Sequence, residues 1–296
     1  MLYNNLSTYL KTRYGKRIKK ICIDGGFGCP NRDGKCGTGG CIYCGERGAG
    51  EHIDPSLSIT AQVREQLRRS NAEGFIAYFQ NFTNTYAPIA TLKERYDSAL
   101  VDPRIVALAI GTRPDCIDED IADLIASYKD RCDVWVELGL QCASDRTAEI
   151  INRGYKTEVF SKAVDILKSR GIPVVAHMII GLPDEGIDEV DKTADLINAS
   201  GVWGVKIHSI YVMEGTVLSE MYREKLYTPP EMAEYVSLAA RTVRRLSPNI
   251  VIHRLTGDCP DGLLVAPEWN KNKNAVIEAI RRTLSEEGGQ GSLFEP

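Results

Sequence analysis

One short loop holds four of the nine cysteines of this 296-residue chain. It runs from residue 29 to residue 44, reads CPNRDGKCGTGGCIYC, and follows a short apolar run at residues 18–23 that predicts a strand. Its many glycines disfavour both helix and strand. A loop that crowds thiols and wraps its backbone this closely predicts a bound metal.

The thiols leave two kinds of metal site open. A structural zinc site is closed by four ligands, which Cys29, Cys36, Cys41 and Cys44 could supply. An iron–sulfur cube is also bound by thiolates, usually four of them. When only three cysteines bind the cube, one iron stays open to a ligand from outside the protein.

Composition places the chain among soluble globular proteins, with 43% hydrophobic and 26% charged residues. Nine cysteines without a signal peptide predict a reducing compartment. No apolar run reaches the roughly 18 to 20 residues that cross a bilayer. We therefore expect a cytoplasmic protein with no membrane partner. The net charge of −4 carries no nucleic-acid signature.

Apolar β-branched runs alternate with helical patterns at intervals of about 30 residues, as in parallel βαβ units. Strands are predicted at residues 18–23, 75–82, 105–111, 134–140, 174–180, 205–212 and 250–255. Helices are predicted at residues 58–73, 89–99, 118–128, 157–169, 185–199, 231–246 and 274–284. Because a closed barrel of this type needs eight strands, the predicted fold class is α/β, an open partial (β/α)6 TIM-like barrel with an extra C-terminal strand and helices.

We expect one domain over residues 1–296. Its predicted parts are an N-terminal extension (1–17), the partial barrel core (18–213), C-terminal elements (214–284) and a loose tail (285–296).

Polar groups follow every predicted strand, where barrels of this kind carry their chemistry. The exits read QNFTNTY at 80–86, GTRPDC at 111–116, ELGLQC at 137–142, HMIIGLP at 177–183, KIHSIY at 206–211 and HRLTGDC at 253–259. Taken singly, each has a structural explanation: a strand histidine is more often a core residue, and Glu137 could simply pair with Arg113. Together they predict a polar pocket that faces the cysteine loop.

In this order, the segments CPNRDG…GGCIYC, FQNFTNT, GTRPDC, VELGLQ, NRG, IIGLP and HRLTGD resemble the radical S-adenosylmethionine (SAM) family typified by the bacterial proteins YtqA and YhcC. A more distant resemblance is to the radical SAM half of the Elongator catalytic subunit. The resemblance covers about residues 3–284. The spacing of the cysteines, eleven residues and then two, departs from the commoner three and then two.

The resemblance implies two cofactors, a [4Fe–4S] cluster and SAM. Cys29, Cys41 and Cys44 match the cysteines of the family pattern and are the implied cluster ligands. Cys36 lies outside that pattern, so we treat it as a bystander thiol or a lower-ranked substitute for Cys29.

The resemblance also implies SAM-binding residues. Gln141 would contact the SAM ribose, Arg153 would pair with the SAM carboxylate, and His177 stands where relatives place a second ribose contact. Backbone groups between residues 80 and 83 would accept from the SAM amino group. The other implied cofactor-binding residues are Gln80, Thr83, Thr112, Arg113 and Glu137.

The implied reaction is reductive cleavage of SAM to a 5′-deoxyadenosyl radical, which removes a hydrogen atom from substrate. One MnmL-like branch of the family is linked to tRNA wobble uridine, converting 5-carboxymethylaminomethyluridine to 5-aminomethyluridine. The implied partners are tRNA, an electron donor such as flavodoxin or ferredoxin, and a downstream methyltransferase.

Two segments are compatible with RNA: six cations between residues 10 and 20, and the sequence WNKNK at 269–273. Both are equally compatible with ordinary surface. The alternatives are a radical SAM enzyme with a small-molecule or protein substrate, and a non-catalytic protein stapled by zinc.

Overall fold

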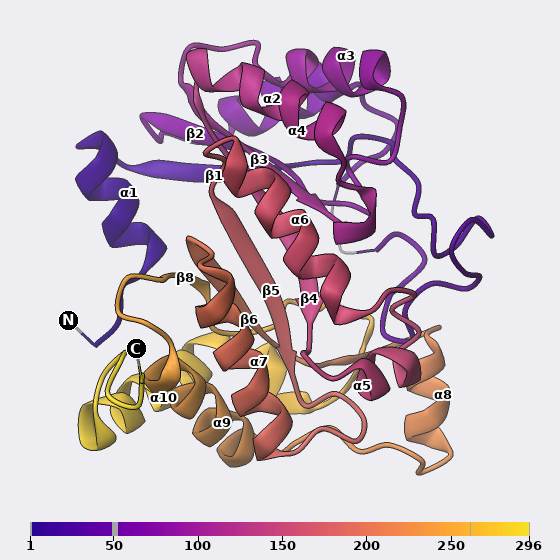
Figure 1. The fold of residues 1–296 in the computed structure, drawn as a ribbon, viewed down its shortest axis with the longest axis vertical. Coiled ribbons are helices and arrows are strands. Elements are labelled where there is room, and N and C mark those ends of the chain that lie inside the picture. The colour runs from indigo at the N-terminus through magenta and orange to yellow at the C-terminus, as the bar shows by residue number, and fades with distance from the viewer. Residues whose placement is uncertain (1, 49–52, 261, 296) are drawn as a thin grey trace.

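The computed structural model describes residues 2–48, 53–260 and 262–295. Residues 1 and 296, the outer ends of the predicted extension and tail, lie outside this range. The described strands form a seven-stranded parallel sheet in the order β1-β2-β3-β4-β5-β6-β8 and a two-stranded antiparallel sheet of β7 and β9 (Figure 1). The large sheet consists of β1 (Ile18–Ile23), β2 (Gly74–Phe79), β3 (Ile105–Thr112), β4 (Asp133–Gln141), β5 (Val174–Ile180), β6 (Gly204–Ser209) and β8 (Val251–Arg254).

Each strand of the large sheet lies beside the strand of that sheet that precedes it in the chain, and β1 and β8 at its two edges are not paired with each other. This arrangement confirms the predicted open partial barrel with an extra C-terminal strand.

All of the predicted helices are present. They are α2 (Ile59–Arg68), α3 (Ile89–Ala99), α4 (Glu119–Ala126), α6 (Thr157–Ser169), α7 (Ile187–Ser200), α9 (Met232–Arg245) and α10 (Lys273–Glu287). Asp118 caps α4, since its Oδ1 accepts from the Ile121 N–H at 2.8 Å.

The main apolar core lies between the outer face of the sheet and these helices. Leu108 and Ile110 of β3 and Val136 and Leu138 of β4 are fully buried in it. Alternate residues of a strand point to opposite faces, so the same strands also present a second set of side chains to the inner face.

The N-terminal extension contains a helix that the sequence analysis did not predict, α1 (Leu6–Tyr14). Leu10 packs against Ile76 and Trp135 in a small apolar cluster on the inner face of the sheet. The backbone just before the helix extends the open edge, where the Ile252 N–H donates to the Asn4 carbonyl at 2.7 Å. Helix α1 therefore fills the inner side of the half-barrel between its two free edges, at the N-terminal ends of the strands.

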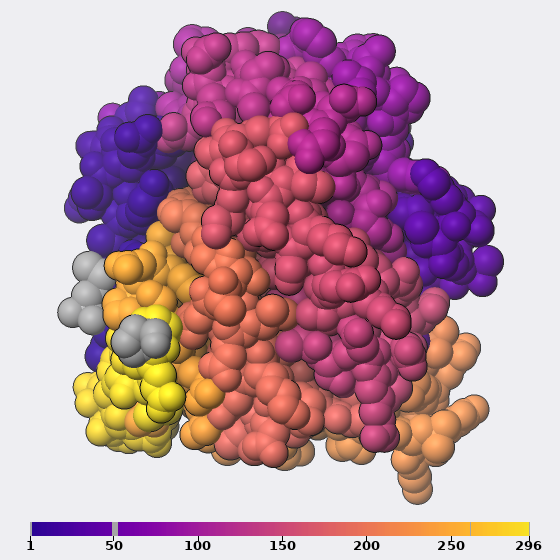
Figure 2. All heavy atoms as spheres, viewed as in Figure 1, coloured from indigo at the N-terminus to yellow at the C-terminus, as the bar shows by residue number. Residues whose placement is uncertain are grey.

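A third cluster packs the cysteine loop onto the carboxyl ends of the strands. Its buried members include Ile42, Ile151, Ile210 and Leu218. The other described elements lie largely in these connections: α5 (Asp145–Ile150), α8 (Val217–Arg223), β7 (Val212–Met213), β9 (Leu264–Ala266), and the short 3₁₀ turns η1 (Pro114–Cys116), η2 (Ser127–Asp130) and η3 (Glu268–Lys271). Figure 2 shows the two N-terminal segments, α1 and the cysteine loop, on opposite sides of the molecule.

Residues 288–295 were expected to be loose, but they are bonded to the body of the protein. The Gln290 amide donates to the carbonyls of Ser247 (2.7 Å) and Ile250 (2.8 Å), and its oxygen accepts from the Asn4 N–H (2.8 Å). These bonds place the two ends of the chain side by side (Figure 1).

No helix within the described ranges combines the length and the apolar character that crossing a membrane requires.

Candidate cofactor site

The cysteine loop closes into a tight turn around its last two thiols. The Cys44 N–H donates to the Cys41 carbonyl at 2.9 Å. The Arg32 guanidinium bridges the turn, donating to the carbonyls of Cys44 (3.2 Å) and Gly45 (2.5 Å). Gly40 has a φ of +79°, and a Cβ there would lie 2.9 Å from the Arg32 side chain, so the close approach of Arg32 requires glycine.

Two asparagines fasten this loop to the segment that follows α5. The Asn152 amide donates to the carbonyls of Gly40 (2.7 Å) and Thr38 (3.1 Å). In return, the Asn31 amide donates to the Asn152 carbonyl at 2.6 Å. The NRG motif thus has a visible structural role, because it anchors the loop that carries the thiols.

The thiols of Cys41 and Cys44 interact directly. The hydrogen bond from Cys44 lowers the pKa of Cys41 to about 7, and the Asn31 amide lies 3.8 Å from the Cys41 sulfur. Cys29 is close enough for its charge to act on Cys44. A thiol with a lowered pKa is readily converted to the thiolate that binds metal.

Cys36 has different surroundings. Its side chain is largely exposed. The little burial that it has, together with the nearby Asp115 carboxylate, raises its pKa. Across the described part of the chain, no three side chains of His, Cys, Asp or Glu converge closely enough to hold one metal ion. The ligand set Cys29, Cys41 and Cys44 therefore stays a prediction.

The polar loop after β2 binds the end of β3. The Asn84 amide donates to the Gly111 carbonyl at 2.6 Å, and the hydroxyls of Thr85 and Thr112 share a hydrogen bond of 2.7 Å. Thr112, a predicted cofactor contact, therefore already has one partner within the protein.

Four buried side-chain oxygens around this loop and the cysteine loop have no hydrogen-bond partner among the described groups: Asn31 Oδ1, Asn81 Oδ1, Thr83 Oγ1 and Asn84 Oδ1. The Thr83 N–H donates to the Gly28 carbonyl at 3.1 Å, which places it beside the cysteine loop. The Gln80 N–H, directly after the end of β2, donates to the Ile23 carbonyl at 3.1 Å. Buried acceptors without a partner point to a ligand or ordered water.

Gln141 ends β4 in a left-handed conformation, with a φ of +66°. A Cβ on Gly139 would lie 2.8 Å from the Gln141 Nε2 and 3.2 Å from the Tyr155 hydroxyl. The amide and hydroxyl therefore lie together over a position that has no side chain. Both groups therefore present polar atoms on the inner face of β4.

Arg113 does not pair with Glu137, so that sequence-based alternative is wrong. Its guanidinium makes a bidentate pair with Asp115 (2.9 and 2.6 Å) and donates to the Arg153 carbonyl (3.0 Å). It also lies 4.7 Å from the centre of the Tyr155 ring. The sequence places Asp115 only two residues away, and a rigid strand exit lets the two side chains meet.

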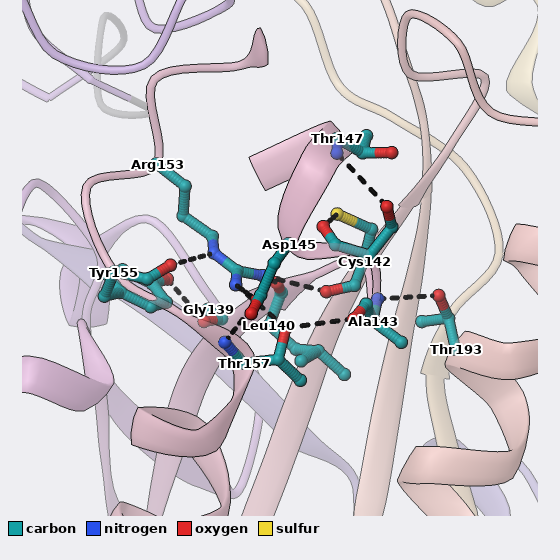
Figure 3. A network of polar contacts seen from close by, with 11 residues as sticks. Gly139, Leu140, Cys142, Ala143, Asp145, Thr147, Arg153, Tyr155, Thr157 and Thr193 are labelled. Atoms are coloured by element: carbon teal, nitrogen blue, oxygen red, sulfur yellow. Dashed lines mark hydrogen bonds and ion pairs between the residues drawn. The ribbon is translucent and has the colours of Figure 1, made fainter. Parts of the chain in front are cut away.

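Arg153 is fully buried, and protein groups surround its guanidinium (Figure 3). It donates to the carbonyls of Leu140 (2.5 Å), Cys142 (2.8 Å) and Tyr155 (3.1 Å) and to the Thr157 hydroxyl (3.0 Å). The Asp145 carboxylate lies 3.6 Å away. The structure gives Arg153 a scaffold role at the end of β4, and its predicted pairing with the SAM carboxylate remains untested.

Glu137 lies at the centre of a buried cluster on the inner face of the sheet. Its Oε2 contacts the Lys206 ammonium and His177 Nε2 (2.9 Å). Its Oε1 accepts from Trp135 Nε1 (3.1 Å) and lies 3.5 Å from the Lys20 ammonium. Four different strands thus supply the groups that surround one carboxylate.

Charge and burial oppose each other in this cluster. Burial alone would raise the pKa of Glu137, but the Lys20 and Lys206 charges and the His177 hydrogen bond hold it well below its ordinary range. Burial lowers the pKa of Lys206 to about 7 and that of His177 to about 4. Glu137 is therefore the ionised member and His177 is neutral near pH 7.

The sequence analysis singled out Glu137 and His177 but not the two lysines that flank them. Lys20 was read as part of a surface basic run and Lys206 as one residue of a strand exit. The signal that could have found them is alternation: Lys20 shares the inward face of β1 with Ile18 and Cys22, and Lys206 shares that of β6 with Gly204 and His208.

Comparison with known proteins identifies the family. The sequence matches the radical SAM superfamily over residues 26–197 and the radical SAM C-terminal domain over residues 202–286. This chain belongs to the radical SAM superfamily. Its relatives by sequence include YtqA of Bacillus subtilis (36% identical, covering 99% of this chain and 93% of YtqA) and YhcC of Escherichia coli K12 (35% identical, covering 99% and 96%).

Two further radical SAM comparisons point toward the Elongator family. The tRNA uridine(34) acetyltransferase of Dehalococcoides mccartyi is 29% identical over 185 residues, which cover 61% of this chain and 39% of that protein. The solved structure of Elp3 from Methanocaldococcus infernus has a TM-score of 0.68 at 21% identity and covers 91% of this chain. This chain spans 63% of the length of that Elp3 chain, so the likeness concerns the shared fold.

Radical SAM enzymes use a [4Fe–4S] cluster and SAM, and the residues present fit both. Clustered thiols, one with a lowered pKa, are the donors that an iron–sulfur cube takes. The orphaned buried oxygens around the cysteine loop fit a polar organic ligand beside it. This family membership favours the cluster over the closed zinc site that the cysteines alone had left open.

Our first prediction concerns the cluster ligands. Replacing Cys29, Cys41 or Cys44 by Ala should abolish iron binding, whereas Cys36→Ala should keep about four iron and four sulfide per chain, as a cubane contains. Iron and sulfide analysis with electron paramagnetic resonance of anaerobically reconstituted protein measures this. Loss of iron in Cys36→Ala would show that the ligand assignment is wrong.

The second prediction separates the scaffold role of Arg153 from SAM binding. Arg153→Met should lower the free energy of unfolding of the apoprotein by at least about 3 kcal/mol, because several buried carbonyls lose their donor at about 1–3 kcal/mol each. The control Arg146→Met removes a guanidinium whose side chain is 81% exposed and should change stability by about 0.5 kcal/mol or less. Urea unfolding measures both. An unchanged stability in Arg153→Met, with weaker SAM binding, would contradict the scaffold role.

The third prediction concerns pH. The pKa of His177 is about 4 in the folded protein and 6.5 ordinarily, so the unfolded chain takes up the proton first as pH falls. Stability should therefore decrease between pH 6.5 and 4, by up to about 3 kcal/mol at about 1.4 kcal/mol per pKa unit. His177→Gln should lose this part of the decrease. Urea unfolding at several pH values compares the two, and parallel curves would contradict the assignment.

Proposed function

We propose that this radical SAM enzyme modifies the wobble uridine of tRNA, converting 5-carboxymethylaminomethyluridine to 5-aminomethyluridine. The observation that carries the proposal is the similarity of this chain to a protein named as a tRNA uridine(34) acetyltransferase. The likeness of the fold to that of Elp3 agrees with it.

A basic surface beside α1 supports an RNA substrate. A cavity of about 620 Å³ lies between α1 and the start of β1, and its lining includes Lys11, Lys16, Arg17 and Lys20. Such a cluster of cations suits phosphate groups, which supply much of the affinity for nucleic acids. Arg13 belongs to the same sequence run but pairs with Asp133 instead, at 3.0 Å.

The second RNA-compatible segment, residues 269–273, gives no such support. The Trp269 ring is stacked on Tyr235, with ring centres 5.2 Å apart. Lys271 pairs with Glu268 at 2.8 Å, and Lys273 pairs with Asp258. These contacts hold the C-terminal elements together, so RNA contact is assigned to the α1 side alone.

When bound, the cluster and SAM supply a carbon radical that removes a hydrogen atom from the substrate. The chain's own part is to hold and enclose these groups. In the proposal Cys29, Cys41 and Cys44 hold the cluster. The proposed SAM-binding residues are Gln80, Thr83, Thr112, Arg113, Glu137, Gln141, Arg153 and His177. Apolar strands and few polar groups around them keep water from a reactive centre.

Radical SAM enzymes need a reductant. We propose flavodoxin or ferredoxin for this role, and a methyltransferase as the consumer of the 5-aminomethyl product. The free amine of that product is the group that a methyltransferase would alkylate.

The fourth prediction tests the substrate. Deleting the gene should remove the 5-aminomethyl step, so bulk tRNA should accumulate 5-carboxymethylaminomethyluridine, measured by nucleoside mass spectrometry. Wild-type and Cys36→Ala genes should restore the wild-type profile, whereas Cys44→Ala should not. Identical nucleoside profiles in all strains would exclude the tRNA substrate and direct the search to small molecules or proteins.

A further inference from the structure

The inner-face cluster carries more positive than negative charge. The ammonium groups of Lys20 and Lys206 both contact the same carboxylate, that of Glu137. Arg254, whose charge also reaches the cluster, lies 3.6 Å from Asp258. Two lysine side chains thus share one carboxylate, which leaves an excess of one positive charge on the wall of the half-barrel whenever Lys206 is protonated.

Glu137 has no capacity left to balance that excess. Its two oxygens already face four donor groups, from Lys20, Trp135, His177 and Lys206. The side chain is fully buried, so it is held as a fixed anion between the lysines.

Both lysines keep donor capacity that Glu137 does not use. An ammonium has three N–H groups, and Lys206 directs two of them to Glu137 and to the Tyr78 hydroxyl, 3.2 Å away. Lys20 contacts Glu137 only at 3.5 Å, and its side chain is 25% exposed. Both ammoniums lie 4.3 Å from the centre of the Tyr78 ring, one from β1 and one from β6.

Unpartnered histidine nitrogens lie along the same wall. Among the described residues, His208 Nε2 and both ring nitrogens of His253 are buried without a hydrogen-bond partner. The His208 ring lies 5.3 Å from that of His177, on the strand that carries Lys206. A neutral imidazole has one donor and one acceptor, so His208 can donate to a group that enters from the strand exits.

The wall between the cluster and the cysteine loop is lined by small residues. The inward positions of β3 and β4 carry Ala109, Gly111 and Gly139, and a Cβ on Gly111 would already lie 3.2 Å from the Tyr78 hydroxyl. A substrate group that enters from the strand exits therefore meets the Gln141 amide and the Tyr155 hydroxyl over Gly139 before it reaches Tyr78 and the lysines.

We propose that Lys20 and Lys206 bind a carboxylate of the substrate on the inner face of the half-barrel, with His208 as an additional donor. The excess of one positive charge matches a singly charged anion better than a phosphate monoester, which carries about two negative charges near pH 7. This inference rests on the proposed function, and it identifies the carboxymethyl group of the modified uridine as the part that the inner face recognises.

The fifth prediction uses two tRNA anticodon stem-loops that differ in one group. One carries 5-carboxymethylaminomethyluridine at the wobble position, and the other carries the carboxamide of the same side chain, which has the same shape without the charge. Binding to the reconstituted holoenzyme with SAM but no reductant is measured by fluorescence anisotropy. The carboxylate form should bind about tenfold tighter, since it forms charge-assisted hydrogen bonds to lysine.

Lys206→Met and Lys20→Met should each reduce this preference to about threefold or less. Binding of the carboxamide form should stay unchanged in Lys206→Met, whereas Lys20→Met should weaken binding of both stem-loops because Lys20 also lines the basic surface beside α1. The matched control is Lys19→Met, which alters the neighbouring exposed lysine of β1 and should keep the preference. Circular dichroism checks that each variant is folded. If Lys206→Met does not fold, the test rests on Lys20→Met, which alters a partly exposed side chain. An unreduced preference of Lys20→Met for the carboxylate stem-loop overturns the proposal.

The same measurement separates this inference from the proposed function. Equal binding of the two stem-loops to the wild-type protein overturns the carboxylate site while leaving the tRNA substrate in place. If neither stem-loop binds, the tRNA substrate fails, and the two free nucleosides are then compared in the same way by calorimetry. A carboxylate preference that depends on Lys20 supports the site for a small-molecule substrate, and no preference overturns it.

Discussion

The site depends on the hydrogen bonds that the buried guanidinium of Arg153 donates. It binds the carbonyls of Leu140 and Cys142, where β4 ends, and so fixes the turn that contains Asn152. Asn152 in turn holds the cysteine loop through the Gly40 and Thr38 carbonyls. A glycine-rich loop has a high conformational entropy when it is free. Its anchoring to a rigid strand end explains how the turn that carries Cys41 and Cys44 keeps its shape without a regular element.

The two faces of the sheet bury different kinds of side chain. The outer face is covered by helices and carries aliphatic side chains, as parallel sheets require. The inner face contains a charged cluster, which is expensive to bury unless every charge has partners. Glu137 meets that condition with four donor groups, whereas among the described residues His208 Nε2 and both ring nitrogens of His253 lack a hydrogen-bond partner. Polar groups left without partners on a wall that is otherwise well packed indicate a surface shaped for a ligand, because a purely structural cluster would satisfy them.

The sequence predicted the parallel sheet and its helices because long apolar runs, such as residues 105–111 and 174–180, have few alternatives to a buried strand. It missed α1, whose apolar and charged residues do not separate clearly into two faces, since this helix packs by a few contacts such as Leu10. The polar residues at the strand exits were identified, but their partners were not. Arg113 pairs with Asp115, and Glu137 pairs with two lysines that are distant in sequence. Pairings of this kind depend on which strands become neighbours across the curl of the sheet, and residue patterns do not contain that information.

The basic run near the N-terminus shows how one sequence feature can divide between two environments. Lys19 and Lys20 are adjacent in β1, so the alternation of the strand places them on opposite faces. Lys20 turns inward to Glu137, while Lys11, Lys16 and Arg17 line the cavity beside α1 together with it. Lys20 therefore belongs to both the basic surface and the inner cluster. An RNA whose backbone meets the outer cations would bring negative charge to one side of the wall, while the wobble base would have to enter from the strand exits. The half-barrel therefore offers positive charge in two places, from the cations beside α1 at the N-terminal ends of the strands and from Lys20 and Lys206 on its inner face.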